Sequence, residues 1–443
     1  MNIVIVSILV IISIIAIIIL TSYWKIQAFI ALFLVSVFLA FATLPADTIV
    51  ATIKQGFGNT MASIGFLIIF GAIIGIILDK TGGTISIANY ILSKTGEKRS
   101  SRALAITGFI TGLPIFCDSG FIILSGLAKS FSSKSKISIA FMATVLATSL
   151  YSVHCLIPPH PGALAAAGII NVNVGHLIVL GIIFAVPGAA AAYLWGKWMV
   201  KGRNYEPTPE MGDEVILSRK DLPPVFLSFL PIVVPLILIT IKSLINLVDK
   251  EGVSILARIF FFPGEPVFAL AIGVVLGLFL IKKKTVEAFN SVFSEAIVKA
   301  GPILIVTAAG GMFGMVIKST GIGEAMGNLL AGTNIGLVAP FLIAVIMKTA
   351  QGSSTVAIIT TASFVLPMLQ MLGLDSEWGR LLTMLSMGAG SMIASHANDS
   401  YFWVISNFAG LDINTTLKVY STSTIVMGTV VFAFVWAASL FLL

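Results

Sequence analysis

The sequence predicts an all-α polytopic membrane protein with about 12 membrane segments. Of its 443 residues, 58% are hydrophobic and 10% are charged, and the mean hydropathy is +1.06. Many apolar runs approach the ~20 residues that a helix needs to span a bilayer. These observations together place the chain among the polytopic membrane proteins before any motif is considered.

Apolar segments follow one another along the chain, and several contain a polar or helix-breaking interruption. We predict membrane segments at residues 3–20, 26–44, 61–79, 103–129, 137–157, 163–198, 223–247, 265–281, 299–318, 336–373, 379–394 and 401–443, with interruptions in 103–129, 163–198, 336–373 and 401–443. The first is predicted to be a retained helix, because no small-residue cleavage pattern of a signal peptide precedes Trp24.

The longest polar stretch divides the chain into two halves. Residues 201–222 contain many charged side chains together with Pro207 and Pro209. We predict that this stretch is a cytoplasmic linker. It joins an N-terminal half, residues 1–200, to a C-terminal half, residues 223–443.

Basic residues predict which loops are cytoplasmic, because Lys and Arg are enriched on that side of a membrane. They cluster in the two loops that flank segment 103–129: Lys80, Lys94, Lys98, Arg99 and Arg102 in one, and Lys129, Lys134 and Lys136 in the other. With both loops on one side, segment 103–129 is a re-entrant hairpin that breaks at 116–120. Lysines at 282–284 mark a further cytoplasmic loop, so a second hairpin, which breaks at 351–355, enters from the opposite side.

The two halves share local patterns. Glycines and a threonine recur with the same spacing in both: Gly71, Gly75, Thr81 and Gly82 match Gly310, Gly314, Thr320 and Gly321. Polar breaks at 158–162 and 395–400 also occupy matching places. The opposed hairpins make the predicted repeat an inverted one. Inverted repeats with interrupted helices are typical of secondary transporters, whose binding sites lie near the membrane midplane.

Four segments carry a resemblance to a known family. GLPIFCDSGF at 112–121, PPHPG at 158–162, AQGSSTVA at 350–357 and SHANDS at 395–400 resemble the gluconate permease (GntP) family of proton symporters, over essentially the whole chain. The resemblance implies import of gluconate or a related small hydroxy acid with a proton across the bacterial cytoplasmic (inner) membrane. It also implies a homodimer, an elevator-like motion, and a substrate site formed by the hairpins and the unwound helices.

The predicted substrate site combines backbone NH groups for a carboxylate with side chains for hydroxyl groups. Its candidate residues are Ser119, Gly120, His160, Gly162, Lys348, Gln351, Gly352, Ser353, Ser354, Thr355, His396, Asn398 and Ser400. Asp118 and Asp399 are the candidates for proton coupling, because an ionised Asp within a membrane segment is costly. A small organic acid anion and membrane lipid are the expected partners.

Each charged candidate also has a structural interpretation. Asp118 couples a proton or caps the helix that follows it. Lys348 pairs with the substrate carboxylate, extends to the interface, or pairs with a neighbouring carboxylate. Asp399, with Asn398, holds substrate or a proton, or caps the helix that starts at Tyr401.

The histidines are also open to two interpretations. His160 and His396, at matching breaks, relay protons or bind substrate hydroxyls, or are simply satisfied polar groups. No role is assigned to His154 or His176.

Several functions are not supported. The basic residues lie in short loops beside apolar segments, so they indicate topology and no nucleic acid partner. Cys117 and Cys155 lack metal-ligand spacing and are expected to be free thiols. Phosphate-loop and hydrolase motifs are absent, so we expect no enzyme, metal or cofactor.

Other transporters remain open as alternatives. These are a permease for glycerate, hydroxybutyrate or D-serine, a sodium-coupled dicarboxylate carrier, and a cation/proton antiporter. A channel or a structural membrane protein would not need opposed hairpins.

Overall fold

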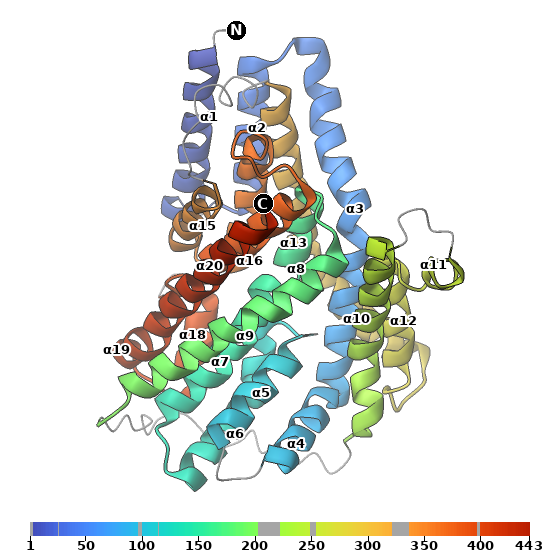
Figure 1. The fold of residues 1–443 in the computed structure, drawn as a ribbon, viewed down its shortest axis with the longest axis vertical. Helices are drawn as coiled ribbons and strands as arrows, with labels where there is room; N and C mark the ends of the chain where they lie inside the picture. The colour runs from blue at the N-terminus through green and yellow to red at the C-terminus, as the bar shows by residue number, and fades with distance from the viewer. Residues whose placement is uncertain are drawn as a thin grey trace.

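The computed structural model describes residues 3–24, 26–95, 100–113, 115–202, 222–248, 254–320, 336–396 and 399–443, and this part of the chain is built from helices (Figure 1). The prediction of an all-helical chain is confirmed. Most of the predicted linker, residues 203–221, lies outside the described residues. The division into two halves therefore stays a prediction.

The first half contains two long unbroken helices and several short ones. Its helices are α1 (Ile3–Ile18), α2 (Ala28–Thr43), α3 (Ala46–Thr81), α4 (Gly83–Thr95), α5 (Ser100–Gly112), α6 (Cys117–Ser135), α7 (Ile139–Leu156), α8 (Pro161–Ile169) and α9 (Val174–Met199). A short π-helix at Ile19–Tyr23 follows α1. The pairs α5–α6 and α7–α8 are each separated by a break of a few residues.

The second half has a similar order of long and broken helices. Its helices are α10 (Val225–Val248), α11 (Ile255–Phe260), α12 (Pro266–Leu278), α13 (Val286–Ser319), α15 (Val338–Gln351), α16 (Ser354–Val365), α17 (Glu377–Met392), α18 (Ser400–Ala409), α19 (Ile413–Thr416) and α20 (Thr422–Leu442). A 3-10 turn at Leu366–Met368 and a π-helix at Leu417–Ser421 lie between them. Here the broken pairs are α15–α16 and α17–α18.

The breaks lie where the sequence favours the end of one helix and the start of another. Helix α7 ends before Pro158 and Pro159, and α8 begins with Pro161 in its first turn, where a proline needs no hydrogen-bond donor. Gly352 ends α15 with φ of 81°, a left-handed conformation that glycine adopts without strain. Ser353 then caps α16 by accepting a hydrogen bond from the Val356 amide.

Two helices are longer than the apolar pattern predicted. Helix α3 begins at Ala46 rather than near residue 61, and α13 begins at Val286 rather than near residue 299. The added turns contain polar residues, so a prediction based on hydropathy alone leaves them out of the membrane segments. They are helical because α3 and α13 pack closely against each other, and a packed helix need not be apolar on every side.

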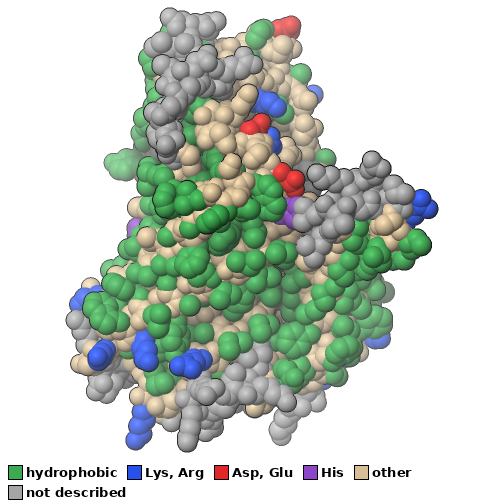
Figure 2. Space-filling model, viewed as in Figure 1, with side chains coloured by type: hydrophobic (Ala, Val, Ile, Leu, Met, Phe, Trp, Pro, Cys, Tyr) green, Lys and Arg blue, Asp and Glu red, His purple; other side chains and the backbone are tan. Residues whose placement is uncertain are grey.

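The outer surface suits a membrane. Hydrophobic side chains cover the middle of the face shown in Figure 2, and Lys and Arg side chains gather along its lower left edge. Within the described part of the chain, five helices are long and apolar enough to cross a bilayer, or six if the bent helix α3 is one span. The chain is therefore an α-helical membrane protein, and the prediction of about 12 membrane segments stays a prediction.

The contact between α3 and α13 depends on a glycine. A Cβ atom added to Gly311 would lie 1.8 Å from Thr60 Oγ1, so replacement by alanine forces the helices apart. We expect Gly311→Ala to destabilise the protein by about 1–3 kcal/mol. Gly301→Ala in the same helix is the matched control, because nothing lies within 4 Å of its added Cβ. Thermal unfolding of both purified variants tests this, and equal unfolding temperatures would contradict it.

Candidate functional site

A cavity of about 420 Å³ lies where the broken helices meet. Its wall combines residues at the start of four helices, α2, α6, α16 and α18, with residues from within α7 and α13. Both predicted hairpins reach it, α5–α6 through Asp118 and α15–α16 through Thr355. The structure thus brings together segments that are far apart in the sequence.

Helix N-termini give the cavity wall a partial positive charge, because the first amide groups of a helix lack partners within it. At α16 and α18 one of these amide groups has a partner, because the side chains of Ser353 and Asp399 each accept a hydrogen bond from the backbone. At α6 the N-cap position is Phe116, and no side chain caps the helix. The start of α6 therefore keeps amide groups that are suited to an anion.

Asp118 lies in the first turn of this uncapped helix. Helix α6 begins at Cys117, so the predicted hairpin break at 116–120 is displaced: the structure has its break at 113–116, of which Pro114 lies outside the described residues. The interpretation of Asp118 as the cap of a later helix is wrong for the same reason. Its Oδ1 atom is buried and has no hydrogen-bond partner among the described residues.

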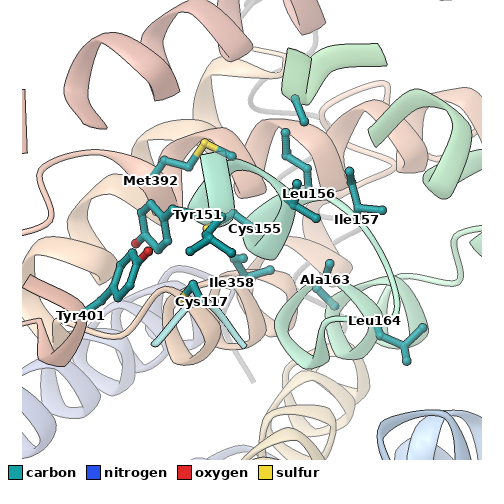
Figure 3. Packing of buried hydrophobic residues seen from close by; sticks show 14 of the residues in the cluster. Cys117, Tyr151, Cys155, Leu156, Ile157, Ala163, Leu164, Ile358, Met392 and Tyr401 are labelled. Atoms are coloured by element: carbon teal, nitrogen blue, oxygen red, sulfur yellow. The ribbon is translucent and has the colours of Figure 1, made fainter. Parts of the chain in front are cut away.

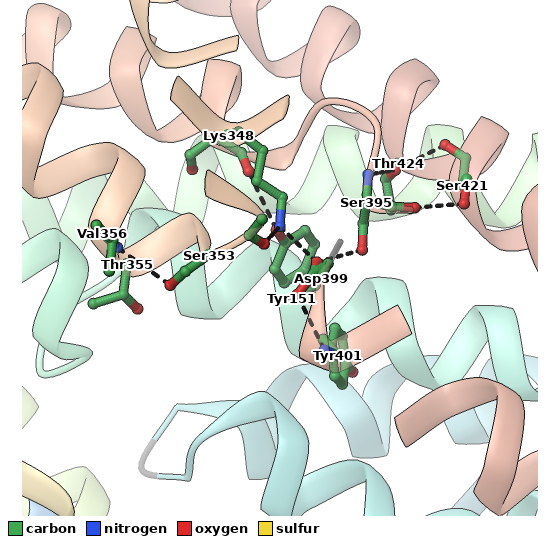
Figure 4. Close-up of polar contacts among 12 residues, drawn as sticks. Tyr151, Lys348, Ser353, Thr355, Val356, Ser395, Asp399, Tyr401, Ser421 and Thr424 are labelled. Carbon is green, nitrogen blue, oxygen red and sulfur yellow. Dashed lines mark hydrogen bonds and ion pairs between the residues drawn. The ribbon is translucent and has the colours of Figure 1, made fainter. Parts of the chain in front are cut away.

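Lys348 forms a buried ion pair with Asp399. The Lys348 Nζ atom lies 2.5 Å from Asp399 Oδ2 (Figure 4). It also donates a hydrogen bond to the Gly352 carbonyl. Lys348 is 0% exposed and Asp399 is 4% exposed. Ser395 donates a hydrogen bond to the same carboxylate, which also caps α18 through the Tyr401 amide. This pairing is one of the alternatives that the sequence left open for Lys348 and Asp399.

Two tyrosines form an aromatic part of the wall. The rings of Tyr151 and Tyr401 lie 5.5 Å apart, and Figure 3 shows them facing each other with Cys117 nearby. Tyr151 donates its hydroxyl proton to the Ser391 carbonyl, and Tyr401 donates to the Ala147 carbonyl. The tyrosines therefore present rings and oxygen lone pairs, while their protons are directed to the backbone.

Two histidines link the second hairpin to the first. His154 Nε2 lies 3.3 Å from Thr355 Oγ1, and His154 Nδ1 lies 3.3 Å from His160 Nδ1. His160 Nε2 lies 2.6 Å from the carbonyl oxygen of Gly112, the last residue of α5. Both rings are buried. His154, to which the sequence assigned no role, lines the cavity, while His160 lies behind it.

The predicted site residues divide into two groups. Those that line the cavity are Asp118, Ser353, Ser354, Thr355, Asp399 and Ser400. Those described residues that lie outside its lining are Ser119, Gly120, His160, Gly162, Lys348, Gln351, Gly352 and His396. Asn398 lies outside the described residues. The second group is structural in part, since Gly120 packs against Leu150 and Gly162 packs against Thr355.

Sequence reasoning missed several residues of the wall. Gln27, Tyr151, His154 and Tyr401 line the cavity, and so do Pro302 and Ile303 of α13. Gln27 lies just before α2 and accepts a hydrogen bond from the Ile30 amide. A polar residue before an apolar helix is a recognisable cap signal, but nothing local indicates that this cap faces a cavity.

Two solved transporter structures share this fold. The chain matches the Alcanivorax borkumensis YdaH transporter with a TM-score of 0.64 and 14% identity, over 90% of each chain. It matches Neisseria gonorrhoeae MtrF, from a class of antimetabolite efflux pumps, with a TM-score of 0.64 and 15% identity, over 89% of this chain and 85% of that chain. This likeness shows the fold that the chain shares with these proteins, that of a polytopic α-helical membrane protein.

The particular family follows from the sequence comparison. The chain belongs to the GntP family of permeases, whose family model matches residues 3–441. It is similar to the inner membrane permease YgbN of Escherichia coli strain K12, with 32% identity over 93% of each chain. It is also similar to the gluconate permease of Bacillus subtilis strain 168, with 30% identity over 94% of this chain and 95% of the relative. The chain is a transporter of the inner membrane, and the predicted family resemblance is confirmed.

Proposed function

We propose that this chain imports gluconate, or a closely related sugar acid, together with a proton. The observation that carries the proposal is the uncapped start of α6 with Asp118 in its first turn, facing a cavity of about 420 Å³. This volume is within the range of small-molecule sites. The amide groups at this helix start attract a carboxylate, and the hydroxyl-bearing wall of α16 and α18 suits a polyol.

The charges of the site support coupling to a proton. Lys348 and Asp399 neutralise each other, so an ionised Asp118 leaves a net negative charge beside the uncapped helix. A substrate carboxylate is repelled by that charge in a cavity of low dielectric constant. Protonation of Asp118 removes the repulsion and frees the helix start for the substrate. Binding of anion and proton together is then more favourable than binding of either alone.

The relatives support a sugar acid as substrate. Besides gluconate permeases, the chain is similar to the Gnt-II system L-idonate transporter of Escherichia coli strain K12, with 31% identity over 90% of this chain and 91% of the relative. Gluconate and idonate both carry one carboxylate and several hydroxyl groups. D-serine, glycerate and hydroxybutyrate remain candidates, and a dicarboxylate carried with sodium remains the main rival.

The arrangement of helices supports an alternating-access mechanism. In each half a long helix (α3 or α13) precedes a broken hairpin, a second broken pair and a long final helix (α9 or α20). We propose that these halves are inverted repeats, that the hairpins and the helices around the cavity move as a unit, and that the chain acts as a homodimer.

The test is uptake of labelled gluconate into proteoliposomes under an inward proton gradient without sodium. We expect accumulation, competed by unlabelled idonate and more weakly by glycerate, hydroxybutyrate or D-serine. A proton ionophore should abolish accumulation, and protein-free liposomes are the control. Transport that requires sodium, or that a dicarboxylate supports and gluconate does not, would overturn the proposal.

A further inference from the structure

We propose that the His154–His160 pair fixes the Thr355 hydroxyl as a hydrogen-bond acceptor toward the cavity, so that Thr355 selects a substrate hydroxyl group. The inference rests on the proposed function, because it concerns how the same site reads a polyhydroxy acid. Its basis is the chain of contacts from Gly112 through His160 and His154 to Thr355.

The Gly112 carbonyl determines which atom donates and which accepts in each contact of the chain. The Gly112 carbonyl can only accept, so His160 Nε2 carries the proton of that contact. A neutral imidazole carries one proton, and His160 Nδ1 is then an acceptor. The 3.3 Å contact between the two Nδ1 atoms therefore requires that His154 Nδ1 donates.

The direction continues to the cavity wall. With its proton on Nδ1, neutral His154 has Nε2 as an acceptor, and the Thr355 hydroxyl donates to it. The hydroxyl has one proton, which this contact uses. Toward the cavity Thr355 thus offers only lone pairs, and it accepts from a ligand hydroxyl but repels a carboxylate oxygen.

Uncharged rings are the physically favoured state of the pair. Both imidazoles are buried, and their partners in these contacts are a carbonyl, a hydroxyl and each other, with no carboxylate among them. A buried charge without a counter-ion is costly, whereas two neutral rings satisfy every contact in the chain.

The fold holds Thr355 against this pair. A Cβ atom added to Gly162, near the start of α8, would lie 3.0 Å from Thr355 Cα and 3.4 Å from Thr355 Oγ1. His160 occupies the N-cap position of the same helix α8, so one short helix positions both His160 and the backbone of Thr355. The packing of α7, α8 and α16 at this point therefore sets the orientation of the Thr355 hydroxyl.

This arrangement also orients the substrate. The carboxylate is excluded from Thr355 and favoured at the start of α6, so the hydroxyl-bearing end faces α16. Loss of the substrate hydroxyl that meets Thr355 leaves this half-buried acceptor without a partner in the occupied site, which weakens binding.

The test compares gluconate with analogues that each lack one hydroxyl, in proteoliposomes containing wild type, Thr355→Val, Thr355→Ser or His154→Leu. For wild type and Thr355→Ser we expect one analogue to show kcat/KM about tenfold below that of gluconate. In Thr355→Val this discrimination should disappear, mainly through a raised KM for gluconate. His154→Leu should also lose this discrimination although Thr355 is present, because the Thr355 hydroxyl can then rotate and donate its proton toward the cavity.

Outcomes against the inference are distinct from failure of the proposed function. If wild type takes up none of the sugar acids, the proposed function fails. If it takes up gluconate, but the ratio of gluconate to every analogue is unchanged in Thr355→Val, the inference is wrong. A purely structural role of the histidines would lower kcat for all substrates alike. Should His154→Leu not fold, the comparison of Thr355→Val with Thr355→Ser decides the matter.

Discussion

Replacement of Asp118 by asparagine is expected to abolish proton-driven accumulation of gluconate, while exchange of labelled for unlabelled gluconate continues. Asparagine has the shape of a protonated aspartate but cannot release a proton. The start of α6 then accepts the substrate carboxylate in every state of the cycle, so the proton gradient no longer drives transport. Internal gluconate should only equilibrate with the external concentration, as measured in the same proteoliposomes with and without a gradient.

The matched control is Asp47→Asn. Asp47 also lies in the first turn of a helix, α3, but it is exposed and outside the cavity wall. Accumulation should survive this change. If Asp118→Asn still accumulates gluconate, Asp118 is not the coupling residue. If it loses exchange as well, Asp118 binds the substrate directly and does not act by repelling the substrate carboxylate.

The breaks in the helices were the most predictable part of this fold. Proline, glycine and polar residues within apolar runs act locally, so the breaks near Pro159, Gly352 and Asp399 were located to within a few residues. The break in the first hairpin was predicted a few residues too late. An aspartate such as Asp118 is favoured both at an N-cap and in the first turn of a helix, and the sequence does not distinguish these positions.

The lengths of α3 and α13 could not be predicted from hydropathy. The turns that precede residues 61 and 299 contain polar residues such as Lys54 and Glu295, which hydropathy assigns to loops. The added turns of α3 pack closely against α13 at Gly56 and Gly311. Those of α13 contact the end of α3, where Lys80 Nζ donates to Ser291 Oγ and pairs with Glu295. Such long-range packing leaves no periodic signal in either segment alone.

The cavity wall shows the same limit. Helix α7 is buried on all sides, so no apolar stripe reveals that Tyr151 and His154 face a cavity. The contact of His154 with His160 crosses a break, and that of Lys348 with Asp399 joins two helix ends distant in sequence. Polar residues at the helix breaks, such as Asp118, Thr355 and Asp399, could be predicted as site residues, whereas the pairing of side chains required the structure.

Replacement of Lys348 by methionine is expected to destabilise the protein by about 3–5 kcal/mol, because it leaves the buried Asp399 carboxylate without its counter-ion. The Gly352 carbonyl loses its donor in the same variant. Thermal and denaturant unfolding of detergent-solubilised protein measures the change. Lys299→Met is the control, since Lys299 and Glu295 form a pair on α13 in which both side chains are nearly 40% exposed, and such pairs contribute about 1 kcal/mol or less.

The double variant Lys348→Met/Asp399→Asn separates the charge from the contact. Neither side chain of the pair is then charged, so we expect it to recover at least half of the stability lost in Lys348→Met. The ion pair joins the end of α15 to the start of α18, so we expect the second hairpin and α18 to move together during transport. Without the ion pair, the double variant should fold but transport gluconate more slowly than wild type. Wild-type rates in the double variant would mean that the pair serves stability alone, and that the hairpin moves independently of α18.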